Sequence, residues 1–258
     1  MNVKKIIYLI LGLFISLIPV KASLQDSIEV GNKLYSEGKF NEAIITYEEV
    51  LDAGFEAAEL YYNLGNAYFK LNDLPRALVN YERAYLLKPN DEEIQNNRNL
   101  ASTYVVDELE EVPVLYIQEL YLNIISIFSS NTWTITSIIF FMIFLFSFFL
   151  FLFSNNILAK KIFFILGIIV FIFSITSYLF ARERYKQVYE NRGAIVLSPS
   201  VTVKSAPGVL GKDLYILHEG TKVKAIKSDK EWVEIKLPNG STGWLKSSDI
   251  IKIAKENS

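Results

Sequence analysis

The chain of 258 residues contains no cysteine, two methionines and a single histidine. Without cysteine it has no disulfide, no thiolate nucleophile and no cysteine-bound metal. The one histidine, His218, would have to serve any catalytic relay alone, and it stands in a predicted surface turn before Glu219 and Gly220. The sequence also lacks a Walker A loop, a dinucleotide fingerprint and a His-Glu-x-x-His helix. We therefore predict no enzymatic activity, with no catalytic, metal or cofactor site.

Charge is absent from two long stretches near the middle of the chain, residues 132–153 and 162–180. Each has about 20 residues, the length that a helix needs to cross a bilayer core, and each is apolar on every side. Two buried helices of a soluble protein are the alternative. Neither stretch contains the carboxylate that an ion or proton path requires, which argues against a transporter. We predict two transmembrane helices joined by a short cytoplasmic loop at 154–161.

Residues 1–23 have the order of a secretory signal peptide: Lys4 and Lys5, an apolar run over 6–20, and small residues at the end. Retention as a third membrane helix is the alternative. A signal peptide carries the following lobe out of the cytoplasm, so both soluble lobes are expected outside and the loop 154–161 inside. Lys160 and Lys161 agree with this orientation, whereas the basic residues after the second stretch do not.

The two soluble lobes carry opposite charge. Residues 24–104 contain 7 Lys and Arg against 14 Asp and Glu, and the tail from Ala181 contains 14 against 9. The first lobe is therefore acidic and the second is basic. Neither has the strongly basic surface of a nucleic-acid-binding protein, so nucleic acid is not an expected partner.

The acidic lobe contains an internal repeat. When the sequence is aligned with itself at a shift of 34 residues, identical residues coincide in these pairs: Gly31 and Gly65, Ala43 and Ala77, Tyr47 and Tyr81. This period and this order of small and aromatic positions resemble the tetratricopeptide repeat, which is built from paired helices. We predict an all-α lobe over 24–104 with two repeats and a capping helix at 91–104, whose apolar side carries Ile94, Leu100 and Ala101.

In tetratricopeptide arrays the first helix of each repeat lines a concave groove. The resemblance implies that a partner-binding groove is formed by Asn32, Tyr35, Tyr62, Asn66, Phe69 and Lys70. Packing between the repeats is the alternative role for each of these residues. Ile28 and Tyr62 stand where a carboxylate clamp has lysine, so an extended or helical apolar peptide is favoured over a terminal carboxylate.

A linker and an amphipathic helix fill residues 105–131. The acidic segment 107–111 predicts a solvated linker, and Pro113 ends it. Residues 115–128 place apolar side chains on one side of a helix, which predicts a helix lying in the membrane interface with lipid as its partner. Trp133 follows at the position of an aromatic belt.

The basic tail predicts a small all-β barrel of about five strands. Short β-rich runs are separated by turn residues, and the Asn239-Gly240 pair predicts a type I′ hairpin turn. The paired Trp and Gly-Trp elements around Trp232 and Trp244 resemble the bacterial SH3-like (SH3b) domain over residues 188–253. This resemblance implies ligand contact at both tryptophans, with packing as the alternative.

The whole order resembles the BatE-type proteins of bacterial aerotolerance (Bat) operons. The resemblance implies a non-enzymatic scaffold in an envelope complex linked to oxidative-stress tolerance. It places the chain in the bacterial inner membrane with both lobes in the periplasm, beside von Willebrand factor A-type membrane proteins and other Bat-operon products. The alternative is a membrane-anchored module that binds peptidoglycan and recruits a hydrolase.

Overall fold

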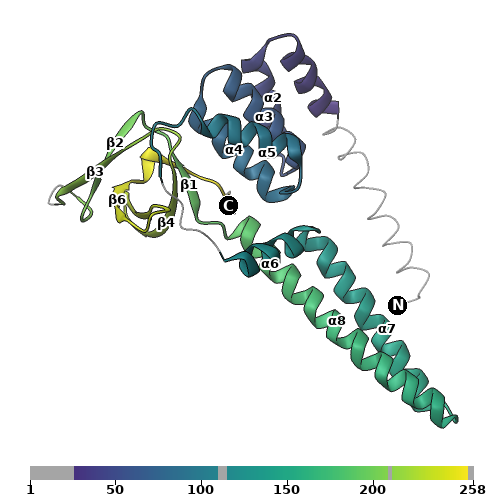
Figure 1. Cartoon of the computed structure of the whole chain (residues 1–258). Coiled ribbons are helices and arrows are strands. Elements are labelled where there is room, and N and C mark those ends of the chain that lie inside the picture. The colour runs from purple at the N-terminus through teal and green to yellow at the C-terminus, as the bar shows by residue number, and fades with distance from the viewer. Residues whose placement is uncertain (1–25, 110–114, 209–210, 255–258) are drawn as a thin grey trace, which may run out of the picture. The chain divides into compact units, whose positions relative to one another are not determined.

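The computed structural model describes residues 26–109, 115–208 and 211–254, so the predicted signal peptide at 1–23 lies outside the described residues. The chain divides into two compact units (Figure 1). One unit joins Met1–Leu109 to Gly193–Ile253, and the other consists mainly of Glu110–Arg192. The first unit contains a helical lobe and a β-sheet lobe, and the second contains the apolar helices.

The helical lobe consists of consecutive antiparallel helices. A helix at 26–36 is followed by α2 (Phe40–Asp52), α3 (Ala58–Lys70), α4 (Leu74–Leu87) and α5 (Glu92–Ser102). Turns one repeat apart use the same conformation, since Gly38 and Asn72 both have positive φ, at 78° and 59°. Side chains cap two helix starts: Asp73 accepts from the Arg76 amide, and Asp91 accepts from the Glu93 and Ile94 amides.

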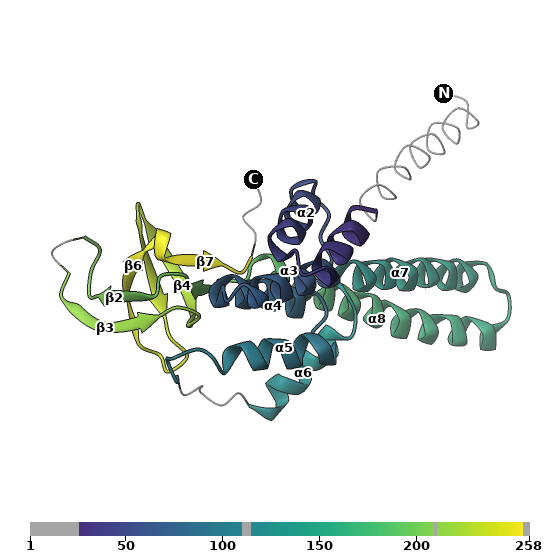
Figure 2. The ribbon, with the colours of Figure 1, turned by 90° about the horizontal axis from the view of Figure 1, so that it is seen from above.

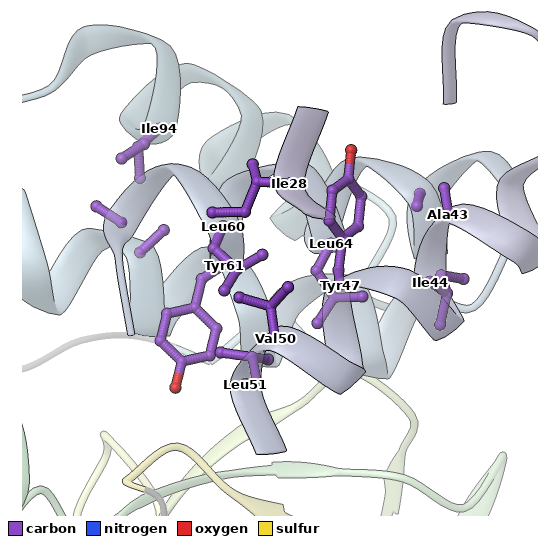
Figure 3. Close-up of a cluster of buried hydrophobic side chains, with 13 residues drawn as sticks. Ile28, Ala43, Ile44, Tyr47, Val50, Leu51, Leu60, Tyr61, Leu64 and Ile94 are labelled. Carbon is purple, nitrogen blue, oxygen red and sulfur yellow. The ribbon is translucent and has the colours of Figure 1, made fainter. Parts of the chain in front are cut away.

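One buried cluster holds the helices of the two repeats together (Figure 3). Tyr47 is 1% exposed, and its repeat counterpart Tyr81 is 2% exposed. Each ring packs on a glycine of the preceding helix: a Cβ at Gly65 would lie 2.8 Å from Tyr81 Cδ1, and one at Gly31 would clash with Tyr47. The predicted register is therefore correct, because the paired glycines and tyrosines make the same contact in both repeats.

Ala77 offers a test of this close approach. It is fully buried on α4, and its carbonyl oxygen lies 3.3 Å from the Cβ position of Gly65 on α3. Ala77→Leu should lower the free energy of unfolding by about 1–3 kcal/mol, because the added methylene groups have no space. Thermal unfolding of the full chain measures this change. Unchanged unfolding would contradict the packing described here.

The predicted capping helix is present as α5, but one of its predicted core residues is exposed. Ile94 and Ala101 are buried, whereas Leu100 is 50% exposed. The prediction for Leu100 was wrong because the buried face of α5 is narrower than its apolar pattern suggested. Leu100 lies one 34-residue period after Asn66, so it corresponds to a predicted groove residue rather than to a core residue.

The second lobe is an antiparallel sheet with the order β3-β2-β6-β5-β4-β1-β7. Its strands are β1 (Gly193–Val196), β2 (Ser200–Lys204), β3 (Asp213–His218), β4 (Lys222–Asp229), β5 (Trp232–Lys236), β6 (Thr242–Lys246) and β7 (Ile250–Lys252). Every strand contributes to one buried cluster, so the sheet wraps around a single core, as expected for an SH3b domain. The strands are more numerous than the sequence analysis predicted.

The turn between β5 and β6 differs from its prediction. The Gly240 amide donates to the Leu237 carbonyl at 3.0 Å, and Gly240 has a φ of 90°. Asn239 does not have positive φ, which excludes the type I′ turn. Pro238 fixes its own φ at a negative value, so the turn places the left-handed residue one position later, at Gly240.

The second unit contains α6 (Tyr116–Ser126), α7 (Ser130–Phe153) and α8 (Ile157–Tyr189). Both α7 and α8 are long and apolar enough to cross a membrane. Asn156 caps α8 by accepting from the Leu158 and Ala159 amides, so Lys160 and Lys161 lie in the helix and not in the predicted loop. Most apolar side chains of both helices are exposed, as expected if lipid surrounds them.

Serine hydroxyl groups form hydrogen bonds between α7 and α8. Ser137 and Ser174 each donate to the other's carbonyl oxygen at 2.9 Å, and Ser147 donates to the Phe163 carbonyl at 2.8 Å. These contacts let the two backbones approach closely and satisfy the hydroxyl groups away from water. The two apolar helices therefore form a packed hairpin.

The predicted amphipathic helix corresponds to α6. Ile125 is fully buried, and its carbonyl oxygen accepts from Trp133 Nε1 at 2.9 Å. The ring of Trp133 also packs edge-on against Phe128 and Phe180. Leu120 and Ile127 remain 48% and 57% exposed, as the proposed position at a lipid interface requires.

Candidate interaction surfaces

Asparagine and tyrosine side chains form a network that repeats along the helical lobe. Asn32 Oδ1 accepts from Tyr47 Oη at 2.7 Å and from Asn63 Nδ2 at 2.9 Å. One repeat later, Asn66 Oδ1 accepts from Tyr81 Oη at 2.8 Å and from Asn97 Nδ2 at 3.0 Å. Corresponding members of the two sets are separated by 34 residues. The network therefore fixes the orientation of both asparagine side chains.

This orientation leaves two amide groups available as donors. Oδ1 of Asn32 and of Asn66 already accepts two hydrogen bonds, which fills its acceptor capacity. Among the described residues, Nδ2 of neither asparagine donates to another group. The two amides can therefore donate to carbonyl or carboxylate oxygens of a bound segment.

The tyrosines of the network remain protonated donors. Burial raises the pKa of Tyr47 to about 12. The pKa of Tyr81 is also raised, mainly by burial and to a lesser extent by the neighbouring Tyr62. Both hydroxyl groups thus keep their hydrogen at physiological pH. The network stays intact under conditions in which a partner would bind.

The other predicted groove residues differ in environment. Tyr35 is half-buried and packs edge-on against Phe40, while Tyr62 is half-buried and accepts a hydrogen bond from Asn97 Nδ2 at 2.8 Å. Phe69 is half-buried, and Lys70 is exposed. Tyr62 thus combines a predicted groove position with a structural contact, and Phe69 and Lys70 offer an aromatic face and a cation.

Three residues of this surface were missed by the sequence analysis: Asn97, Leu100 and Tyr104. Asn97 completes the second network, Leu100 is half exposed, and Tyr104 is 61% exposed with its ring 5.6 Å from that of Phe69. The same 34-residue shift that aligns the repeats also places Asn97 on Asn63. Applied to the capping helix, it would have identified α5 as the first helix of a third repeat.

The sheet lobe brings Trp232 and Trp244 to one face. Glu234 pairs with Trp244 across β5 and β6, and Trp232 lies two residues before Glu234. Paired residues and residues two apart share a face of a sheet, so both half-buried rings lie opposite the core residues Val233 and Leu245. This tryptophan face carries both rings that were predicted to contact a ligand.

A third set of contacts joins the helical lobe to the sheet lobe, through a residue that was predicted to be solvated. Asp107 Oδ2 accepts from the His218 amide at 2.7 Å and from Thr221 Oγ1 at 2.6 Å, and Oδ1 lies 2.8 Å from His218 Nδ1. The side chain of Asp107 is only 14% exposed. The prediction for Asp107 was therefore wrong, because its side chain is largely buried. His218 is the last residue of β3 and does not lie in a turn, but its side chain is still 39% exposed, as predicted for a surface residue.

The hydrogen bonds to Asp107 imply a dependence on pH. Burial alone would raise the pKa of its carboxyl group, but the bonds from Thr221 and His218 outweigh burial and hold the pKa below its usual value. A lowered pKa stabilises the folded state above the usual value of about 4, and this contribution disappears as the pH falls through the folded value.

We therefore expect the contact between the lobes to weaken below about pH 4. Hydrogen exchange of the His218 amide, measured at several acidic pH values, checks this expectation. The variant Asp107→Asn should remove this part of the pH dependence. An identical pH profile in the variant would assign the effect to other groups.

Comparisons with known proteins agree with this architecture. Residues 58–91 match the tetratricopeptide repeat family, residues 31–72 match a second family described as TPR repeat, and residues 199–251 match the bacterial SH3 domain. No curated protein matches the chain. One similar solved structure is an NlpC/P60 family protein from Bacillus cereus ATCC 10987, with 24% identity, 24% of this chain covered and a TM-score of 0.20. The match spans 20% of that chain.

These modules define the class of protein. Tetratricopeptide repeats mediate protein interactions and bacterial SH3 domains bind cell-wall material, so the chain is a scaffold or binding module. Both module types are typically non-catalytic. Within the described residues there is also no group of three or more His, Cys, Asp or Glu side chains that could hold a metal.

Proposed function

We propose that this protein is a membrane-anchored, non-enzymatic scaffold that binds protein segments in the groove of its helical lobe. The observation that carries the proposal is the pair of oriented donors on Asn32 and Asn66, whose acceptor atoms are already occupied. Peptide carbonyl oxygens are the natural acceptors for such donors. The neighbouring rings of Phe69 and Tyr104 add an anchor site for a large side chain, and the exposed Leu100 adds apolar surface on α5.

The proposed setting is the bacterial inner membrane, with α7 and α8 as the anchor and both lobes in the periplasm. The predicted signal peptide supports this orientation, and a cell-wall-binding domain type is useful only outside the cytoplasm. Resemblance to BatE-type proteins supports an envelope complex of the aerotolerance type. Von Willebrand factor A-type membrane proteins and other Bat-operon products are the partners that this resemblance favours.

The groove is tested by the double variant Phe69→Ala, Tyr104→Ala. Both rings are at least partly exposed, so their loss should leave the helical fold intact. Aromatic anchors often contribute 2 kcal/mol or more to an interface, so partner recovery from native membranes should fall at least about tenfold. Partners identified by crosslinking and mass spectrometry with the wild-type chain provide the reference.

The matched control is the double variant Val30→Ala, Ile45→Ala. These side chains are 52% and 58% exposed on the helix at 26–36 and on α2, so the control removes exposed apolar groups outside the proposed groove. Equal recovery with both double variants would contradict the groove. Lost helicity in the Phe69 variant would instead assign its rings to stability, which circular dichroism of the same sample detects.

The second candidate function is a cell-wall module, and the tryptophan face favours it. Trp232 and Trp244 share the outer face of β5 and β6, and Lys204 pairs with Trp244 from β2. An aromatic face beside a cation can contact sugar rings and acidic stem peptides. If the lobe binds peptidoglycan, the full chain should sediment with purified cell wall, and Trp232→Ala with Trp244→Ala should abolish this binding.

A further inference from the structure

The repeat array ends before its last helix pair is complete. Ile94 of α5 lies one period after Leu60, and Asn97 lies one period after Asn63, so α5 is the first helix of a third repeat. No second helix follows it in the residues described between 103 and 109. Repeat arrays need a terminal unit that covers their last apolar face. The exposed end of α4 and α5 must therefore be covered by something else.

The sheet lobe supplies the missing apolar cover. Along β1, Ala194 and Val196 point into the sheet core, whereas Ile195 belongs to a cluster with Ala77, Leu78 and Ala101. Ile251 of β7 pairs with Ile195 and packs against the same cluster, and Ile253 is buried in it. The outer face of β1 and β7 thus carries three isoleucines toward α4 and α5. Strands β1 and β7 both contact α4, and Figure 2 labels β7 and α4.

The segment after α5 and the β3–β4 turn complete this cover. A Cβ at Gly220 would lie 3.0 Å from Val105 Cγ2 and 3.2 Å from Leu78 Cδ1, so the turn approaches the helices as closely as a glycine permits. Thr221 is 1% exposed, and its hydroxyl group donates to Asp107. Removal of this carboxylate would leave a buried donor without its partner, which is costly.

Charged side chains of α4 contact the sheet lobe directly. Lys222 Nζ donates to Glu82 Oε2 at 2.7 Å, and Glu82 itself is buried. Arg83 Nε donates to the Ile253 carbonyl at 2.9 Å, and its Nη2 donates to the Lys252 carbonyl at 3.1 Å. The acidic helical lobe and the basic sheet lobe are also complementary in overall charge. Apolar, polar and charged contacts therefore act at one surface.

We infer that the sheet lobe is the C-terminal cap of the repeat array, and that its β3–β4 turn, residues 218–222, binds the chain's own α4 and Asp107. This assignment gives the SH3b domain an internal ligand, in addition to any that the tryptophan face binds. It also makes the two apolar helices an insertion within one folded body. The inference is independent of the proposed function, because its tests require no outside partner.

The contact is tested first by crosslinking, for which a cysteine-free chain is well suited. In the full chain in detergent, the pair Glu82→Cys, Lys222→Cys should react with a short bis-maleimide at least about tenfold faster than a distant pair. The control pair is Glu82→Cys, Lys230→Cys, because Lys230 follows the far end of β4, roughly 25 Å along the strand from Lys222. Equal rates for the two pairs would overturn the inference.

The capping role is tested by hydrogen exchange with the double variant Asp107→Ala, Thr221→Val. It removes the carboxylate together with the Thr221 hydroxyl group, and the His218 amide also loses its acceptor. Amides of α5 should exchange about tenfold faster than in the wild type, since loss of the cap promotes local opening. Amides of β5 and β6 provide a check that the sheet remains folded. Unchanged exchange in α5, with β5 and β6 protected, would contradict the capping role.

Discussion

Tyr81→Ala should lower the free energy of unfolding of the helical lobe by about 3–5 kcal/mol, the usual cost of deleting a large buried aromatic side chain. Tyr81 fills the space that Gly65 leaves on α3, and its hydroxyl group orients Asn66. Small domains have only about 5–15 kcal/mol of stability in total. The variant should therefore be close to unfolding, and it should also lose the hydrogen bond that orients Asn66.

Two further variants separate the two roles of this side chain. Tyr81→Phe keeps the ring and removes only the hydroxyl group, so it should cost about 1 kcal/mol, the usual value of one hydrogen bond. Tyr104→Ala removes an aromatic ring that is 61% exposed, and it should change the free energy of unfolding far less than Tyr81→Ala. Chemical denaturation of the full chain, followed by helical circular dichroism, measures all three. Equal losses for Tyr81→Ala and Tyr104→Ala would contradict the packing.

The fold class was predictable because each of its parts has a strong sequence pattern. The glycine and tyrosine positions recur at 34 residues because the same helix contact is built twice. The two apolar stretches contain no charge, and only length and composition are needed to expect α7 and α8. Short β-rich runs with glycine turns predicted the sheet lobe, although not the shape of its Pro238-Asn239-Gly240 turn.

The contact between the lobes was not predictable from local patterns. Asp107 follows a helix in an acidic segment, and nothing nearby in the sequence shows that its partners lie 111 and 114 residues away. One signal was present: Ile195 and Ile251 occupy alternate positions that should face solvent on a small barrel. An apolar outer face on two adjacent strands indicates a second packing partner.

The residues of the proposed groove were predictable in part. The resemblance to tetratricopeptide repeats identified Asn32 and Asn66, and the structure places both in one repeating network. Leu100 and Tyr104 were missed because the capping helix was treated as an end of the array rather than as its third member. In a repeat protein, the alignment at the repeat length should therefore be continued past the last complete repeat, because an incomplete repeat can contribute residues to the same surface.

The proposed arrangement is a membrane-anchored protein whose two lobes lie together outside the cytoplasm. The contact between the lobes supports this arrangement. Glu82 and Asp107 precede α7 and α8 in the sequence, whereas Thr221 and Lys222 follow them. Thr221 donates to Asp107 and Lys222 donates to Glu82, so the two lobes contact each other. Lobes that pack together must lie on the same side of a membrane. Two membrane spans between them meet this requirement, because the second span returns the chain to the side where the first began. The proposal that this is the outer side depends on the predicted signal peptide.

Cysteine labelling in intact cells whose outer membrane has been permeabilised tests this claim most directly, because the wild-type chain has no background signal. Three single variants place one thiol at an exposed position: Glu49→Cys on α2, Lys227→Cys on β4, and Asn155→Cys between α7 and α8. A membrane-impermeant maleimide should label the first two fully and leave the third unlabelled until the inner membrane is lysed. Labelling of Asn155→Cys before lysis, or protection of either lobe, would contradict the arrangement.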